Sequence, residues 1–263
     1  MTTTRRGLLA GSAAVALGAA LDAPAAQAHT AGGRGPTVVL VHGAFADASG
    51  WNGVASRLVR AGHPVIAPPN PLRGVAADSA YLAGILATLA GPLVLVAHSY
   101  GGMVVTNAAT GNPNVKALVY VDAFVPDEGE TLLGLQTAYP GSLLDETALD
   151  FRPYGEGLVD AYIKKERFHD VFAGDLPRAA THLMWAGQRP ADTRALGEPS
   201  GAPAWRSVPS WYLVGRDDRV LPPAAQRFMA RRAGARTVET DASHVAMTAR
   251  PAETAALVAR AAR

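Results

Sequence analysis

The sequence contains no cysteine among its 263 residues. Disulfide bonds, thiolate metal sites and a cysteine nucleophile are therefore excluded, and the fold has to be stable through packing alone. Aromatic residues are few, at 6%, and the formal net charge is only +2. Because no basic stripe with interleaved aromatic residues is present either, the sequence gives no support for nucleic acid as a partner.

Three signatures of cofactor chemistry are missing as well. The chain has no Walker loop, no Gly-x-Gly-x-x-Gly turn after a strand and no His-Glu-x-x-His pair. We therefore expect neither a nucleotide cofactor nor a metal. No internal repeat is visible, and a length of 263 residues with 49% hydrophobic and 17% charged residues fits one globular domain.

The first residues have the pattern of an export signal. Paired arginines, Arg5 and Arg6, precede an apolar, alanine-rich run, and Ala26-Gln27-Ala28 supplies a small-x-small cleavage site. We expect residues 1–28 to be a twin-arginine-type signal peptide, so that the protein is secreted, periplasmic or held at the cell surface. The apolar run is too short and interrupted to favour a lasting membrane anchor.

From residue 37 onward, apolar runs alternate with helix-like segments. All but the last of the expected strands are uncharged and apolar, as strands buried on both faces of a parallel sheet are. They lie at 37–41, 64–67, 92–97, 117–121, 209–214 and 236–239. The expected helices lie at 51–61, 76–89, 103–110, 223–233 and 251–262. The alternation predicts an α/β fold, with a mostly parallel central sheet covered by helices on both faces.

The alternation stops between about residues 124 and 206. This segment has no strong strand signal, contains amphipathic stretches such as 158–166, and is too long for a bare loop. We interpret it as a helical cap inserted into a single domain of residues 29–263. Its apolar side chains favour a hydrophobic ligand, although packing of the cap is the simpler explanation for any single one. They are Phe124, Leu132, Leu133, Leu135, Phe168, Phe172, Met184 and Trp185.

Ser99 lies on a turn between an apolar run and a helix-like segment. Small residues two positions before and after it, Ala97 and Gly101, let the strand and the helix approach each other at a strained elbow. A serine in such an elbow is presented as a nucleophile. The alternative, a serine that caps an ordinary helix, explains Ser99 but not the flanking His98 and the glycine pair at 101–102.

Four segments of the chain together resemble the α/β-hydrolase superfamily, specifically its small serine esterases, which include plant methylesterases and hydroxynitrile lyases. The segments are Val-His-Gly-Ala-Phe at 41–45, Ala-His-Ser-Tyr-Gly-Gly at 97–102, Gly-Arg-Asp-Asp-Arg-Val-Leu-Pro at 215–222 and Ser-His at 243–244. The chain departs from the family at Ala97, where glycine is usual. The resemblance implies an α/β-hydrolase fold and a catalytic triad in the order nucleophile, acid, histidine.

In this resemblance the triad consists of Ser99, Asp218 and His244. His244 follows an expected strand and precedes the last helix, where a general base for Ser99 belongs. The family spacing of glycine, two residues, aspartate, three residues and proline selects Asp218, with Asp217 as an open alternative. Asp122 is a further candidate acid, because some hydrolases carry theirs after this earlier strand; otherwise it caps a helix or loop at the mouth of the site.

An oxyanion hole needs two backbone N–H groups, one just after the nucleophile and one from the loop that follows the first strand. By resemblance, these groups belong to Tyr100 and Ala44. Phe45 and Phe124 are the expected substrate contacts. His42 is expected to hold the first loop by a hydrogen bond.

The resemblance implies hydrolysis of carboxylic esters of small, hydrophobic substrates through an acyl-enzyme intermediate. The acyl and alcohol groups and the oligomeric state are left open. One alternative is a C–C lyase like the hydroxynitrile lyases, which is disfavoured because that branch has a lysine beside the histidine loop, where this chain has Ser243. The other is a non-catalytic ligand-binding protein on the same scaffold.

Overall fold

The structure is a computed structural model that describes residues 35–263, so the expected signal peptide lies outside the described residues. The strands are β1 (Thr37–Val41), β2 (Val65–Ile66), β3 (Leu93–His98), β4 (Val115–Val121), β5 (Leu149–Gly155), β6 (Leu158–Ile163), β7 (Ala191–Asp192), β8 (Ser210–Gly215) and β9 (Arg236–Thr240). The α-helices are α1 (Asn52–Arg60), α2 (Val75–Ala87), α3 (Gly101–Ala108), α4 (Leu132–Thr137), α5 (Lys165–Phe172), α6 (Arg178–Ala186), α7 (Pro223–Arg232), α8 (Ala246–Ala249) and α9 (Pro251–Ala261). Short 3₁₀ segments are η1 (Ala48–Trp51), η2 (Glu146–Ala148), η3 (Thr193–Leu196) and η4 (Ala204–Arg206).

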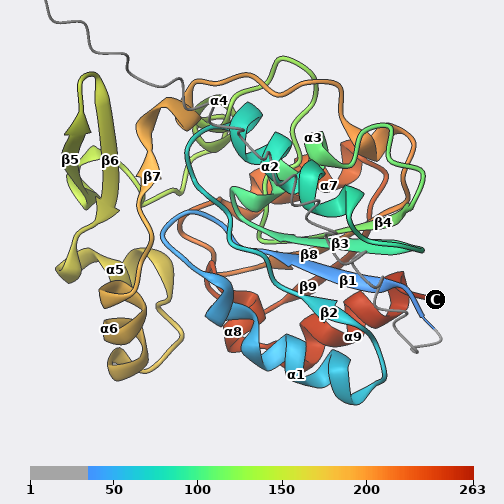
Figure 1. Ribbon diagram of the computed structural model, residues 1–263. Helices are drawn as coiled ribbons and strands as arrows, with labels where there is room; N and C mark the ends of the chain where they lie inside the picture. The colour runs from blue at the N-terminus through green and yellow to red at the C-terminus, as the bar shows by residue number, and fades with distance from the viewer. Residues whose placement is uncertain (1–34) are drawn as a thin grey trace, which may run out of the picture. The chain divides into compact units, whose positions relative to one another are not determined.

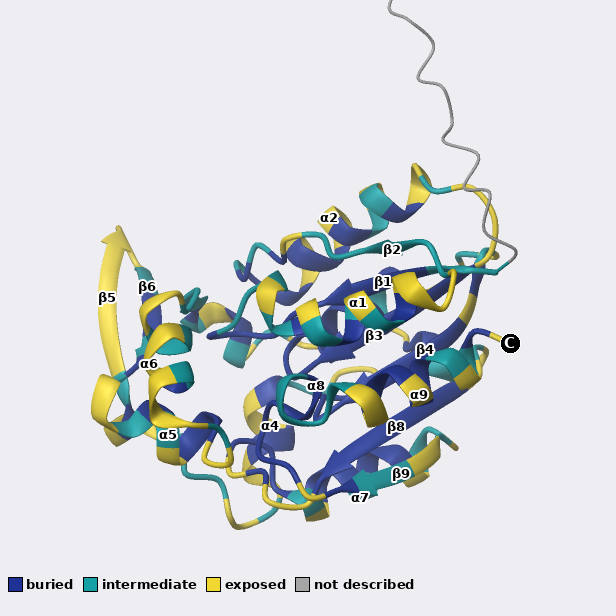
Figure 2. Cartoon of the chain, turned by 90° about the horizontal axis from the view of Figure 1, so that it is seen from below, coloured by how far each residue is buried: buried dark blue, intermediate teal, exposed yellow. Residues whose placement is uncertain are grey.

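A six-stranded sheet forms the centre of the described chain, with the strand order β2-β1-β3-β4-β8-β9. Each neighbouring pair in it is parallel. Helices α1, α8 and α9 cover one face of this sheet, and α2, α3 and α7 cover the other (Figure 1). Figure 2 shows the middle strands as almost wholly buried between these layers, which explains why their sequences are continuous apolar runs.

The predicted α/β fold is confirmed. All six predicted central strands and all five predicted helices are present, with ends that differ from the prediction by at most two residues. No helix within residues 35–263 combines the length and hydropathy that a membrane crossing needs.

The inserted segment differs from the prediction, because it is not purely helical. It contains α4, α5 and α6, but also a three-stranded antiparallel sheet in the order β5-β6-β7, which Figure 1 shows beside α5 and α6. The stretch 158–166 therefore begins as strand β6 and enters α5 only at Lys165. The signal for a hairpin was the turn at Glu156-Gly157, where Gly157 has a φ of 68° that glycine adopts readily.

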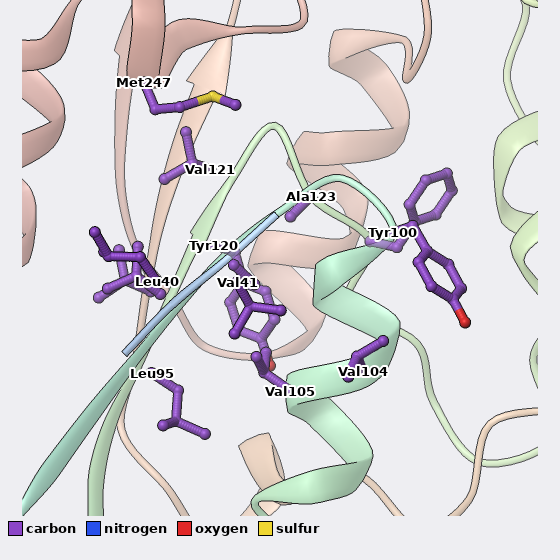
Figure 3. Close-up of a cluster of buried hydrophobic side chains, with 14 of the residues drawn as sticks. Leu40, Val41, Leu95, Tyr100, Val104, Val105, Tyr120, Val121, Ala123 and Met247 are labelled. Atoms are coloured by element: carbon purple, nitrogen blue, oxygen red, sulfur yellow. The ribbon is translucent and has the colours of Figure 1, made fainter. Parts of the chain in front are cut away.

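Packing of α3 against the sheet fixes the start of that helix. Figure 3 shows Tyr100 at this start, with Val104 and Val105 further along the helix and Val41 and Tyr120 from the sheet nearby. The Tyr120 hydroxyl also shares a hydrogen bond of 2.9 Å with Thr106 Oγ1 inside the core. Helix α3 is therefore packed firmly against the central sheet.

Candidate active site

The turn between β3 and α3 is a strained elbow with Ser99 at its tip. Ser99 has a φ of 52°, a left-handed conformation that is unfavourable for residues with a side chain. A Cβ atom at Gly101 would lie 2.8 Å from the carbonyl oxygen of Val41, and one at Gly102 would lie 2.0 Å from that of Phe124. Only glycine fits at these two positions, so the sequence pattern that predicted the elbow has a direct steric cause.

Three side chains that are far apart in the sequence form one hydrogen-bonded chain at the carboxyl ends of the strands. Ser99 Oγ lies 2.8 Å from His244 Nε2, and His244 Nδ1 lies 2.7 Å from Asp218 Oδ2. The Asp218 carboxylate accepts, so Nδ1 carries the proton and Nε2 is free to accept the proton of the serine hydroxyl. The structure therefore brings together the three residues that the sequence predicted as a triad.

Asp218 is held by four donors aimed at its two oxygens. Oδ1 accepts from the N–H groups of Val220 and Leu221 at 2.8 and 2.9 Å, and Oδ2 accepts from Gln226 Nε2 as well as from His244, each at 2.7 Å. Burial raises the pKa of Asp218, and the hydrogen bonds from the two backbone N–H groups and Gln226 oppose that rise. Four donors around one carboxylate favour its ionised form and fix its orientation.

Asp217, the alternative candidate for the acid, is exposed and takes no part in the hydrogen bonds that join Ser99, His244 and Asp218. Its backbone N–H donates to the carbonyl oxygen of Ala242 at 3.1 Å, which turns the next residue inward. Gln226, which holds Asp218 from α7, was not predicted, because no motif relates a helix residue to an acid that lies eight positions earlier in the chain.

His244 is completely buried beneath two aromatic neighbours. The ring of Phe172, from α5 in the cap, lies edge-on with its centroid 5.2 Å from that of His244. His98 lies on another side, with a centroid distance of 4.8 Å, and its Nε2 donates to the His244 carbonyl oxygen at 2.7 Å. Burial lowers the pKa of His244 to about 3, so the neutral imidazole is the favoured form.

Within residues 35–263, two backbone N–H groups near the elbow, those of Ala44 and Tyr100, have no backbone acceptor. The N–H of Phe45, in contrast, donates to the carbonyl oxygen of Arg189 at 3.0 Å. The loop of Ala44 approaches closely only because residue 43 is glycine, since a Cβ there would lie 2.6 Å from Ser99 Cβ. This arrangement is suited to an oxyanion hole. The hydrogen bond between Phe45 and Arg189 connects the loop of Ala44 to the cap.

His42 holds the loop after β1, as the sequence predicted. Its Nε2 accepts from the N–H of Asn70 at 2.9 Å, and its carbonyl oxygen accepts from Asn70 Nδ2 at 3.0 Å. Burial lowers the pKa of His42, which keeps the ring neutral and able to accept at Nε2. Asn70 lies in a loop without a recognisable motif and was not predicted.

Asp122 is not the acid of the triad; its carboxylate caps two backbone N–H groups, as the alternative interpretation predicted. Its Oδ1 accepts from the N–H of Gly215 at 2.8 Å, and its Oδ2 accepts from the N–H of Ala246 at 2.9 Å. These two hydrogen bonds connect Asp122 to the loop of Asp218 and to the loop of His244. Neither bond involves the His244 ring. The sequence correctly predicted that Asp122 follows strand β4. It did not predict the two N–H groups that donate to Asp122.

Of the two expected substrate contacts, Phe45 and Phe124, Phe45 lies against Phe172 of the cap, whose ring packs against His244. The Phe45 ring meets the Phe172 ring edge-on, with centroids 6.4 Å apart. Phe124 is only 2% exposed, and its backbone N–H donates to the Ser99 carbonyl oxygen at 3.2 Å, so its position supports the elbow. Phe168 and Trp185 instead line a cavity of about 350 Å³ between α5 and α6, whose lining includes none of Ser99, Asp218 and His244.

The residue before His244 is tied to the cap. Ser243 Oγ donates to the Asp175 carboxylate, which follows α5. The chain's three lysines are engaged elsewhere: Lys116 Nζ donates to the carbonyl oxygen of Pro113, Lys164 Nζ donates to that of Thr147, and Lys165 Nζ lies over the Trp185 ring. The histidine loop therefore has a carboxylate partner and no lysine.

Comparison with known proteins identifies the family of this chain. Residues 38–257 match the family described as the alpha/beta hydrolase family. The chain is 36% identical over 129 residues to the carbendazim hydrolyzing esterase of Nocardioides sp. (strain SG-4G), a match that spans 43% of this chain and about half, 51%, of that protein. It is 27% identical over 247 residues to the putative methylesterase 19 of Arabidopsis thaliana, spanning 84% of this chain and 95% of that protein.

A solved structure has the same fold. The pyrethroid hydrolase of Sphingobium faniae JZ-2 superposes with a TM-score of 0.69 at 24% identity, over 86% of this chain and 96% of that one. The predicted resemblance to hydrolases of the esterase type is therefore confirmed, and the chain belongs to the alpha/beta hydrolase family.

Proposed function

We propose that this protein is a serine esterase that hydrolyses small, hydrophobic carboxylic esters, with Ser99, His244 and Asp218 as its catalytic residues. The observation that carries the proposal is the hydrogen-bonded chain from Ser99 Oγ through His244 to Asp218, with distances of 2.8 and 2.7 Å. The N–H groups of Ala44 and Tyr100, which donate to no backbone oxygen among the described residues, would bind the negative charge that develops during the reaction.

In the first half of the reaction, Ser99 Oγ attacks the ester carbonyl carbon while His244 Nε2 takes the hydroxyl proton. The carbonyl oxygen becomes an oxyanion and accepts hydrogen bonds from the N–H groups of Ala44 and Tyr100. The Asp218 carboxylate stabilises the imidazolium and keeps its proton on Nδ1. As the tetrahedral intermediate collapses, His244 returns the proton to the alcohol oxygen, the bond between carbonyl carbon and alcohol oxygen breaks, and an acyl group remains on Ser99.

In the second half, a water molecule replaces the alcohol. His244 Nε2 removes one proton from the water as its oxygen attacks the acyl carbon, and the same two N–H groups bind the new oxyanion. The bond to Ser99 Oγ then breaks, the proton passes from His244 to the serine oxygen, and the carboxylic acid leaves. Both halves use one base in one position, which agrees with the rigid burial of His244.

The substrate class follows from the surroundings of the serine and from the relatives. Phe45 and Phe172 form an apolar wall that packs against His244, which favours a hydrophobic acyl or alcohol group. The relatives are named for carbendazim, for pyrethroids and as a methylesterase. A C–C lyase is less well supported, because the histidine loop carries the Ser243–Asp175 hydrogen bond instead of a lysine.

The proposal is tested with a p-nitrophenyl ester series from acetate to long chains, together with a serine-directed fluorophosphonate. We expect hydrolysis of the shorter esters, with an optimum that reports the size of the space beside Phe172, and stoichiometric labelling located at Ser99 by peptide mapping. Absence of both ester turnover and labelling would favour a ligand-binding protein on this scaffold. Labelling without ester turnover, combined with cyanohydrin cleavage, would favour the lyase.

The pH dependence of the reaction should report the buried histidine. Only neutral His244 accepts the serine proton, so activity falls as the pH drops through the pKa of His244. Burial lowers that pKa to about 3 from an ordinary 6.5, and the Asp218 carboxylate on Nδ1 raises it again in part. We therefore expect the acid limb of kcat/KM to lie between these two values, and a limb at or above pH 6.5 would contradict this picture.

A further inference from the structure

A second buried carboxylate lies beside the proposed triad and takes no part in the steps described above. Asp122 follows β4 and is completely buried. Its two oxygens are each satisfied by one backbone N–H, Oδ1 by Gly215 at 2.8 Å and Oδ2 by Ala246 at 2.9 Å. Burying a carboxylate costs free energy unless hydrogen bonds compensate for the lost water. The two hydrogen bonds of Asp122 therefore indicate its role.

The two N–H groups belong to the two loops that carry the acid and the base. Gly215 lies three residues before Asp218, and Ala246 lies two residues after His244. The loops also contact each other directly, since the N–H of Asp217 donates to the carbonyl oxygen of Ala242 at 3.1 Å. Asp122 therefore links both loops to the end of the central strand β4, next to the strand that carries Ser99.

Position 215 leaves no room for a side chain beside the Asp122 carboxylate. A Cβ at Gly215 would lie 2.7 Å from Asp122 Oδ1 and 2.9 Å from the carbonyl oxygen of Ala242. Asp122 itself has a φ of 47°, in the same unfavourable region as Ser99 at 52°. Such strain persists only where the surrounding structure imposes it, and here it directs the carboxylate between the two loops.

We propose that Asp122 is a positioning residue that fixes the acid loop and the histidine loop relative to each other, so that the His244 ring spans Asp218 and Ser99. It acts through the backbone of Gly215 and Ala246 and does not touch the substrate. An acceptor-only side chain is required, because an amide at this position would direct an NH₂ group at one of the two N–H donors. This inference rests on the proposed esterase function.

The test compares Asp122→Asn with wild type and with Asp192→Asn. Asp192 is a matched control, because it is also a completely buried aspartate, but its carboxylate binds Arg194 and Tyr154 in the cap. We expect D122N to lower both kcat and the rate of fluorophosphonate labelling by about 30- to 100-fold, as a slight misplacement of catalytic groups does. KM should stay within about threefold, and D192N should be labelled at the wild-type rate.

A double-mutant cycle separates positioning from a general structural role. If Asp122 acts only through Asp218 and His244, then D218N/D122N should be labelled no more slowly than D218N alone. Additive losses, or wild-type labelling of D122N, would overturn the inference while the esterase proposal stands. Failure of wild type to react with the probe would instead remove the esterase proposal itself.

A second substitution keeps the inference testable if D122N does not fold. If D122N does not accumulate as folded protein, Asp122→Ala leaves space in which water can bind the two N–H groups, and the same rates and the same cycle are measured with it. If neither variant folds, Asp122 serves the fold as a whole and the positioning role is refuted.

Discussion

Replacing Ser99 by alanine should lower kcat/KM for a p-nitrophenyl ester by about 10⁴-fold or more, since removal of a serine nucleophile has effects of this size in serine hydrolases. The side chain that is lost is the one whose hydroxyl donates to His244 Nε2. Covalent labelling by the fluorophosphonate should disappear completely. Residual turnover within tenfold of wild type would show that another group is the nucleophile.

The same position offers a control that separates chemistry from folding. Ser99 has a φ of 52°, so Ser99→Gly removes the nucleophile and relieves the backbone strain, whereas Ser99→Ala removes the nucleophile and keeps the strain. Both variants should be inactive. Allowing for the greater freedom of glycine in the unfolded chain, S99G should be more stable than S99A by about 1 kcal/mol, or roughly 2–4 °C in Tm. A Tm of S99G below that of S99A would contradict the assigned backbone strain.

This strain also explains why the nucleophile was the most predictable part of the site. Strand β3, the turn at Ser99 and the helix α3 are contiguous in the chain, so their steric requirements appear together as small residues at Ala97, Gly101 and Gly102. The central strands were predictable for a similar reason, because burial on both faces demands an uninterrupted apolar run. Steric and burial requirements within one contiguous segment can therefore be recognised from the sequence.

The parts that were not predicted depend on contacts between distant segments. Gln226 donates to Asp218 from a helix, and Asn70 holds His42 from a loop, and neither contact leaves a pattern in the sequence around it. The cap sheet was missed because the strongest apolar positions of 158–166 fit a helix as well as a strand, and pairing with β5 and β7 decides between them. Asp122 was recognised as a candidate, but its role depends on two loops that only the fold brings together.

The second large effect concerns the choice between Asp217 and Asp218, which the sequence left open. In Asp218→Asn, an amide replaces a carboxylate that accepts four hydrogen bonds, so its NH₂ group must face either His244 Nδ1 or the N–H groups of Val220 and Leu221. When the NH₂ group faces His244 Nδ1 it donates to that nitrogen, so the imidazole carries its proton on Nε2 and cannot accept the proton of Ser99; when it faces Val220 and Leu221, the two hydrogen bonds that orient the side chain are lost. We expect kcat to fall by about 10³- to 10⁴-fold with little change in KM, as measured on the ester preferred by wild type.

Asp217→Asn is the matched control, because it makes the same chemical change one residue away. The Asp217 side chain is exposed, and only its backbone N–H is used, in the hydrogen bond to Ala242. An asparagine preserves that bond, so kcat and Tm should stay close to wild type, within about twofold and about 2 °C. If D217N instead loses activity as D218N is expected to, the working acid is Asp217 and the loop must rearrange when substrate binds. If both variants keep most of their activity, the other buried carboxylate beside the triad, Asp122, would have to supply the charge that stabilises the His244 imidazolium.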